Sequence, residues 1–183
     1  MFVRLRERET SLLMIDIQTR LLPSIAGYEA VRANARRLLQ AAGVLSLPVI
    51  YTEQYPKGIG STEEELVAVL PERTRYFEKT AFSCCDEPGF FDMFQDGEKF
   101  VTVIFGVESH ICVLSTAMDL LSRGRKVVVA ADACGSRNGD NHALALDALR
   151  SCGAGIVPTE TVIYQLLGKA GTPEFKELLP LFK

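Results

Sequence analysis

The segment FVTVIFGVESHICVLSTAMDLLSRG, residues 100–124, decides the fold class of this chain. Its first part, residues 100–106, is almost entirely apolar and predicts a buried β-strand. A helical pattern follows over residues 109–123, and Gly124 is placed to end that helix. A strand that is apolar on both faces is typical of a parallel sheet covered by helices on both sides. The segment therefore predicts an α/β protein.

Short apolar runs and helical patterns alternate along the rest of the chain. Further strands are predicted over residues 11–17, 48–53, 75–79, 126–131 and 155–157. Further helices are predicted over residues 28–42, 86–94, 138–152, 159–167 and 173–179, and residues 54–61 (QYPKGIGS) predict a loop. We therefore expect a single domain over residues 1–183. Its predicted architecture is a three-layer α/β/α, Rossmann-like fold with about six parallel strands in the order 3-2-1-4-5-6.

Composition excludes several classes of protein. The 183 residues are 48% hydrophobic and 23% charged, which is typical of a globular chain. A net charge of −3 argues against a nucleic-acid partner. Residues 1–10 are too charged for a signal core, and no apolar run is long enough for a membrane span. Five cysteines, an odd number, predict reduced thiols in a cytoplasmic protein rather than a disulfide framework.

Two charged residues stand where predicted strands end, and parallel sheets place their sites beyond these carboxyl ends. Asp16 interrupts the apolar run LLMIDI, where a carboxylate is costly unless it is paired or hydrogen-bonded. A role in tethering the next loop and a catalytic role are equally compatible with this position. Lys79 follows the third predicted strand, where a solvated loop lysine is the more common case. Near a carboxylate and a thiol, its ammonium would favour the thiolate.

Cys112 falls in the first turn of the predicted helix 109–123. The helix dipole lowers a thiol pKa at such a position, and free backbone N–H groups there can bind an oxyanion. This spacing suits a nucleophile, although a buried, inert cysteine is the commoner alternative. The other four cysteines have no metal-binding spacing. Cys84 and Cys85 are adjacent and could oxidise, whereas Cys134 and Cys152 suggest no chemistry.

Four segments together resemble the isochorismatase-like cysteine hydrolases, which include nicotinamidases and carbamoylsarcosine amidohydrolase. The segments are LLMIDIQ (12–18), YTEQYPKGIGST (51–62), GVESHICV (106–113) and DACGSRN (132–138). The second, together with the third and fourth, looks like the isochorismatase domain-containing subgroup. The resemblance covers nearly the whole chain.

This resemblance implies a catalytic triad. Asp16 would take the thiol proton, Lys79 would orient the pair and stabilise the thiolate, and Cys112 would attack the substrate carbon. It also implies a non-proline cis peptide between Val107 and Glu108. The backbone N–H groups of Glu108 and Cys112 would then form the oxyanion hole. Members of the family associate, so a homo-oligomer, a dimer or larger, is expected.

The chain departs from two branches of this family. Nicotinamidases carry an Asp-x-His metal motif after the second strand, but residues 52–55 (TEQY) contain no histidine. True isochorismatases lack the nucleophilic cysteine that Cys112 provides. We therefore expect a hydrolase without metal or cofactor that acts on a small amide, imide or ureido substrate through a thioester-type intermediate. The alternative is a thiol redox or regulatory module on the same fold, without hydrolase activity.

Four residues are candidates for the substrate pocket. Gln54 and Tyr55 follow the second predicted strand, Phe82 lies in the loop after Lys79, and His110 lies beside the proposed nucleophile. A capping or surface role for His110 is equally compatible with the sequence. Asp132 and Arg137 are expected to be structural, as a loop tether and an ion-pair partner.

Overall fold

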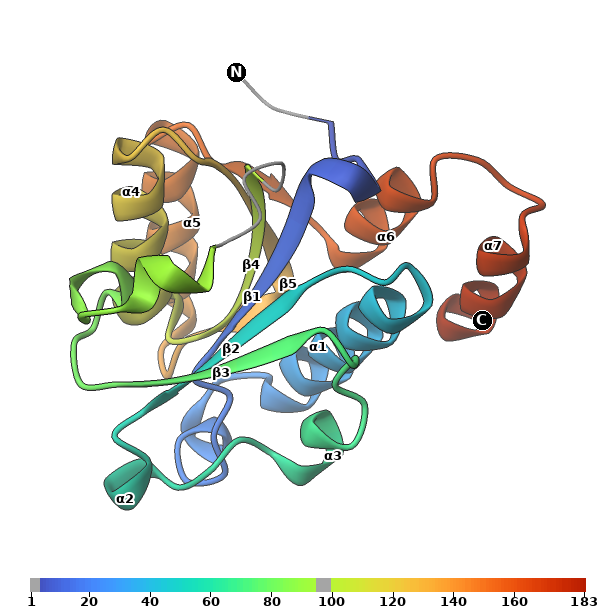
Figure 1. Ribbon diagram of the computed structural model, residues 1–183. Helices are drawn as coiled ribbons and strands as arrows, with labels where there is room; N and C mark the ends of the chain where they lie inside the picture. The colour runs from blue at the N-terminus through green and yellow to red at the C-terminus, as the bar shows by residue number, and fades with distance from the viewer. Residues whose placement is uncertain (1–3, 95–99) are drawn as a thin grey trace.

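A computed structural model describes residues 4–94 and 100–183 of the chain. Its sheet has six parallel strands in the order β3-β2-β1-β4-β5-β6, which confirms the predicted fold and strand order (Figure 1). The strands are β1 (Thr10–Ile15), β2 (Val49–Gln54), β3 (Thr74–Lys79), β4 (Val101–Val107), β5 (Lys126–Gly135) and β6 (Gly155–Val157). The central strands β1 and β4 are buried along their whole length, which explains their nearly continuous apolar sequences.

Helices cover both faces of the sheet (Figure 1). Helices α1 and α6 pack on one face, and α4 and α5 pack on the other. The α-helices are α1 (Tyr28–Val44), α2 (Pro56–Ile59), α3 (Glu64–Val67), α4 (Leu114–Ser122), α5 (Gly139–Ser151), α6 (Thr159–Leu167) and α7 (Pro173–Leu178). A π-helical turn, Ser109–Val113, precedes α4 without a break. Short 3-10 turns occupy Glu7–Glu9, Leu22–Ser24, Cys84–Asp86, Phe90–Met93 and Leu179–Phe182.

Some predicted boundaries are wrong. The predicted helix 86–94 is two short 3-10 turns, because Gly89 adopts a left-handed conformation between them. Strand β5 runs four residues beyond its predicted end, so Cys134 lies within the strand. The predicted loop 54–61 contains the single-turn helix α2, which begins at Pro56, a residue suited to a first helical position.

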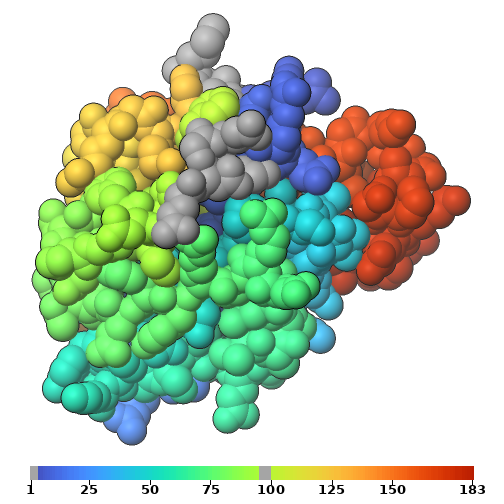
Figure 2. Space-filling model, viewed as in Figure 1, coloured from blue at the N-terminus to red at the C-terminus, as the bar shows by residue number. Residues whose placement is uncertain are grey.

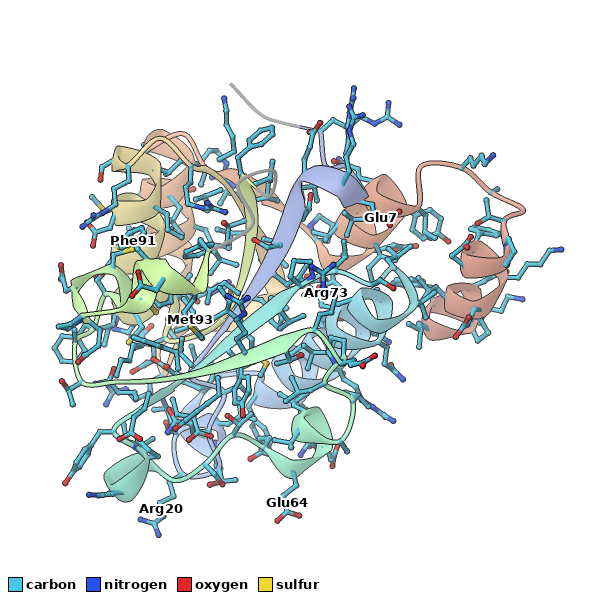
Figure 3. The ribbon with its side chains drawn as sticks, in the orientation of Figure 1. Glu7, Arg20, Glu64, Arg73, Phe91 and Met93 are labelled. Atoms are coloured by element: carbon cyan, nitrogen blue, oxygen red, sulfur yellow. The ribbon has the colours of Figure 1, made fainter. Side chains whose placement is uncertain are left out.

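The carboxyl ends of β1, β2 and β3 lie at one edge of the sheet, where the chain leaves β2 towards α2 (Figure 1). On the face in Figure 2, the segment after β3, in green, forms part of the outer surface. Among side chains labelled in Figure 3, Arg73 lies at the opposite end of β3, and Arg20 and Glu64 point outward from the body. No described helix is long and apolar enough to cross a membrane.

Candidate active site

An ion pair joins two strand ends of the sheet. Lys79 ends β3, the edge strand, and Asp16 directly follows β1, with β2 lying between the two strands. The Lys79 Nζ atom lies 2.8 Å from Asp16 Oδ2, and both side chains are fully buried. Two buried charges in direct contact are far less costly than either charge alone. The structure therefore brings together the two charged residues that the sequence placed at strand ends.

Asp16 occupies a left-handed conformation with φ of 53°. Aspartate tolerates this region better than most residues do, and the bend follows directly after the end of β1. The Asp16 Oδ1 atom accepts a hydrogen bond of 2.7 Å from the hydroxyl of Thr52 on β2. Within the described residues, Oδ2 makes no hydrogen bond apart from its ion-pair contact with Lys79. This oxygen therefore keeps lone-pair capacity for a proton.

Oxygen atoms surround the ammonium group of Lys79. Besides Asp16, it donates to Gln54 Oε1 at 2.6 Å and to the carbonyls of Ala81 and Phe82 at 3.2 and 3.4 Å. Burial is the largest single effect and would lower the pKa of Lys79. The negative charge of Asp16, together with smaller effects of Cys112 and Cys84 and the hydrogen bond to Asp16, outweighs burial and raises the pKa. Lys79 is therefore a fixed cation rather than a proton donor.

Cys112 lies in the π-helical turn that follows β4. The Glu108 carbonyl accepts hydrogen bonds from the N–H groups of Ile111 and Val113, and the second of these bonds spans five residues. Gly106 allows β4 to pass close to the backbone of β1 just before this turn. Its φ is 131°, and a side chain there would collide with the backbone of Ile15 on the neighbouring strand.

The expectation of a lowered thiol pKa is wrong. Burial, followed by the negative charge of Asp16, raises the pKa of Cys112 to about 12, although the nearby charge of Lys79 acts in the opposite direction. The Cys112 side chain is only 7% exposed, so desolvation of a thiolate outweighs the helix dipole. The resting site therefore holds a neutral thiol beside a carboxylate–ammonium pair.

Glu108 is buried, and its carboxylate stabilises the start of the π-helical turn through contacts with Arg137. Its carboxylate accepts from the Arg137 backbone N–H at 2.8 Å and pairs with the Arg137 guanidinium at 2.9 Å. This contact confirms the ion-pair role expected for Arg137. The peptide bond between Val107 and Glu108 is cis. The oxyanion-hole role of the Glu108 and Cys112 backbone N–H groups stays a prediction.

The four candidate pocket residues lie in different environments. Gln54 belongs to the shell of Lys79, and its amide is fixed by a 2.7 Å hydrogen bond from Nε2 to the carbonyl of Thr80. Tyr55 directly follows Gln54, and Phe82 contributes its carbonyl to the shell; the two residues are 53% and 64% exposed. His110 Nδ1 lies 2.9 Å from Ser136 Oγ, in the loop between β5 and α5. A role in substrate binding stays a prediction for all four.

The remaining cysteines fall into two groups. Cys84, Cys85 and Cys134 are buried, and burial raises each of their pKa values to about 11 or 12. Cys152 is exposed. Across residues 4–94 and 100–183, no group of three or more His, Cys, Asp or Glu side chains could hold a metal ion.

Sequence reasoning missed two supporting residues. Thr52 donates a hydrogen bond to Asp16. The sequence indicates this residue only by a threonine within the largely apolar run PVIYT. Gln18 is fully buried, and its amide bonds the backbone N–H and carbonyl of Gln54 and the carbonyl of Gly60. Local spacing does not distinguish Gln18 from a surface glutamine, although it is the last residue of the segment LLMIDIQ. Asp132 is a tether, as predicted, because its carboxylate caps α6 through Thr159.

The fold and this cluster define a member of a known class. The model of the isochorismatase domain matches residues 10–161, and the chain belongs to this hydrolase family. Isochorismatase domain-containing protein 2 of Danio rerio is 39% identical over 178 residues, covering 97% of this chain and 89% of the relative. Isochorismatase family protein 1B of Dictyostelium discoideum is 35% identical over 179 residues, or 96% and 87% of the two chains.

Solved structures agree with this assignment. The structure described as MAR1 ribonuclease from Caenorhabditis elegans is 36% identical and has a TM-score of 0.93, covering 98% of this chain and 92% of its own. Escherichia coli YcaC, described as an octameric hydrolase of unknown specificity, has a TM-score of 0.91 over 98% of this chain and 91% of its own. At 24% identity, YcaC shows the likeness of fold alone.

Proposed function

We propose that this protein is a metal-independent cysteine hydrolase of small amide, imide or ureido compounds, with Asp16, Lys79 and Cys112 as its triad. One observation carries the proposal. The fully buried carboxylate of Asp16 lies 2.8 Å from the Lys79 ammonium, and its negative charge acts on the buried neutral thiol of Cys112. A base beside a nucleophile, oriented by a third group, is the arrangement that covalent catalysis requires.

The reaction proceeds through a thioester. Asp16 takes the thiol proton as the Cys112 sulfur forms a bond to the substrate carbonyl carbon. The backbone N–H groups of Glu108 and Cys112 stabilise the oxyanion. When this intermediate collapses, the C–N bond breaks and the leaving nitrogen takes the proton from Asp16. Water, deprotonated by Asp16, then cleaves the thioester and restores the thiol. Lys79 stays protonated throughout and holds the Asp16 side chain in place through the buried contact.

Substrates are expected to be small and neutral at the reacting carbon. The Lys79 ammonium already has four oxygen partners, so it is not available as an anion-binding group. Gln54 places its side-chain amide beside the Lys79 ammonium, and the rings of Tyr55 and Phe82 are exposed apolar surfaces. These properties suit a planar, uncharged amide group better than a phosphate or a carboxylate.

A substrate panel tests the proposal. Amides, imides and ureides are incubated with the wild-type protein, with Cys112→Ala, and with Cys152→Ala as a matched control at an exposed thiol. We expect turnover of at least one class, loss of about a thousandfold or more in Cys112→Ala, and wild-type rates in Cys152→Ala. Mass spectrometry should trap an acyl adduct on Cys112. Turnover that survives Cys112→Ala refutes the nucleophile.

The redox alternative is disfavoured by the thiol environments. Sensor cysteines have lowered pKa values and solvent access, whereas Cys84 and Cys112 are buried with pKa values raised to about 12. Peroxide treatment distinguishes the two functions. Rapid oxidation of Cys112 without any hydrolysis in the panel would favour the redox module.

RNA is added to the substrate panel because the similar structure from Caenorhabditis elegans is described as a ribonuclease. The net charge of −3 and the internally occupied ammonium of Lys79 disfavour a polyanionic substrate. RNA cleavage that depends on Cys112 would replace the amide substrate in this proposal.

We also propose that the protein is a homo-oligomer. The exposed side chains of Tyr55 and Phe82 offer apolar surface for a second copy. Light scattering after size-exclusion chromatography tests this proposal, and a mass of 20.2 kDa at micromolar concentration would refute it.

A further inference from the structure

Three consecutive residues before Cys112 are each bonded to one segment of the chain. Glu108 pairs with Arg137, Ser109 bonds to His142, and His110 bonds to Ser136. The three partners come from the loop after β5 and the first turn of α5. The turn that carries the thiol is therefore braced from one side by residues 136–142.

The Ser109–His142 contact involves a fully buried hydroxyl. Ser109 is fully buried, and its hydroxyl lies 2.8 Å from His142 Nδ1. No other hydrogen-bond partner is present for this hydroxyl among the described residues. His142 is itself anchored, because its backbone N–H donates to the carbonyl of Asn138 at the start of α5. Burial lowers the pKa of His142, which keeps its ring neutral near pH 7.

The π-helical turn needs such support. It accommodates one more residue per turn than an α-helix, and isolated π-turns of this kind are uncommon and concentrate at functional sites. The five-residue bond from Val113 N–H to the Glu108 carbonyl holds the widened turn. If the turn relaxed to an α-helix, Cys112 would rotate away from Asp16, because each residue of an α-helix advances about 100° around the axis.

We propose that His142 is a positioning residue: through Ser109 it holds the π-helical turn in the register that directs the Cys112 thiol at Asp16. This inference rests on the proposed function, since it assumes that Asp16 deprotonates Cys112. His142 does not touch the reacting atoms. Its contribution is geometric, and it acts through one hydrogen bond.

The test follows the alkylation of all five cysteines by iodoacetamide at pH 7.5, read by peptide mass spectrometry. His142→Leu and Ser109→Ala each remove the bond and are expected to slow alkylation of Cys112 about tenfold. The double variant should be no slower than either single variant, because both remove the same contact. His142→Asn places a polar atom near the position of Nδ1 and should restore the rate to within about threefold.

The other thiols serve as internal controls. Cys84 and Cys134 are buried, so general loosening of the fold would expose and alkylate them, whereas loss of positioning slows Cys112 alone. The inference is overturned if Cys112 reacts at the wild-type rate in His142→Leu, if it reacts faster, or if the single effects multiply in the double variant.

A second measurement separates this inference from the proposed function. If no compound of the substrate panel is turned over in a Cys112-dependent way, the proposed function fails, whatever the His142 variants do. Amide hydrogen exchange of residues 108–114 then decides the inference. His142→Leu should accelerate exchange there at least tenfold, with His142→Asn near wild type and α4 still protected. Unchanged exchange in His142→Leu overturns it.

Discussion

The Asp16–Lys79 ion pair gives the sharpest test of how this site is held. We predict that Asp16→Asn and Lys79→Met each destabilise the fold strongly, because each leaves the other charge buried without its partner. The double variant Asp16→Asn/Lys79→Met should be more stable than either single variant. The side-chain amide that Asp16→Asn introduces can still accept a hydrogen bond from Thr52, so the change isolates the charge.

The magnitude follows from the geometry. At 2.8 Å and an effective dielectric constant of about 20, two unit charges attract by about 6 kcal/mol before desolvation is considered. Breaking a buried pair costs about 3–5 kcal/mol, since the surviving charge keeps some partners. Gln54 and two backbone carbonyls would still contact the ammonium in Asp16→Asn. We therefore expect a loss of about 3 kcal/mol there and slightly more in Lys79→Met.

Urea unfolding followed by circular dichroism provides the measurement, because the chain has no tryptophan for fluorescence. The three variants and the wild type form a double-mutant cycle, and we expect a coupling energy of about 3 kcal/mol or more. A coupling energy below about 0.5 kcal/mol would refute the reasoning. If a single variant fails to fold, soluble expression of the double variant alone still supports coupling.

Three further predictions concern the surroundings of this pair. Thr52→Val should destabilise the protein by about 1–3 kcal/mol in urea unfolding, since it removes the donor to Asp16, whereas Thr52→Ser should be nearly neutral. Gly106→Ala should cost on the order of 3 kcal/mol, because a methyl group would meet the backbone of Ile15 at a φ of 131°; Gly139→Ala, with open space around it, is the control. Stability should fall as pH rises from about 9 towards 12, because the unfolded chain loses the proton of Cys134 near pH 9 and the folded chain loses it near 12. Chemical unfolding at pH 8 and pH 10.5 should show this loss, and Cys134→Ala should reduce it; an unchanged slope would contradict the assignment.

The sheet could be predicted because its central strands carry a strong local signal. β1 and β4 are buried on both faces, so their sequences are apolar almost without interruption. Asp16 could be found because a charge at the end of a buried strand is unusual in itself, whereas only the family resemblance gave Lys79 a role in the site. The boundaries of β5 and of the predicted helix 86–94 were missed, since they depend on contacts made elsewhere in the fold.

The electrostatic state of Cys112 could not be predicted from its position. Helix-start geometry suggests a lowered thiol pKa, but burial and a carboxylate contributed by a distant strand reverse the direction. The same limit applies to Gln18, whose three hydrogen bonds all reach residues far along the chain. Long-range contacts of this kind leave no trace in local spacing.

The position of Lys79 on an edge strand has a consequence for solubility. β3 is an edge strand that pairs only with β2, and exposed edge strands can fray and pair with other chains. The buried contact between Lys79 and Asp16 connects the end of this edge strand to the end of the central strand β1. Edge fraying at this end would therefore have to break a buried ion pair. The two charged groups proposed for catalysis thus also hold this end of the edge strand in the sheet.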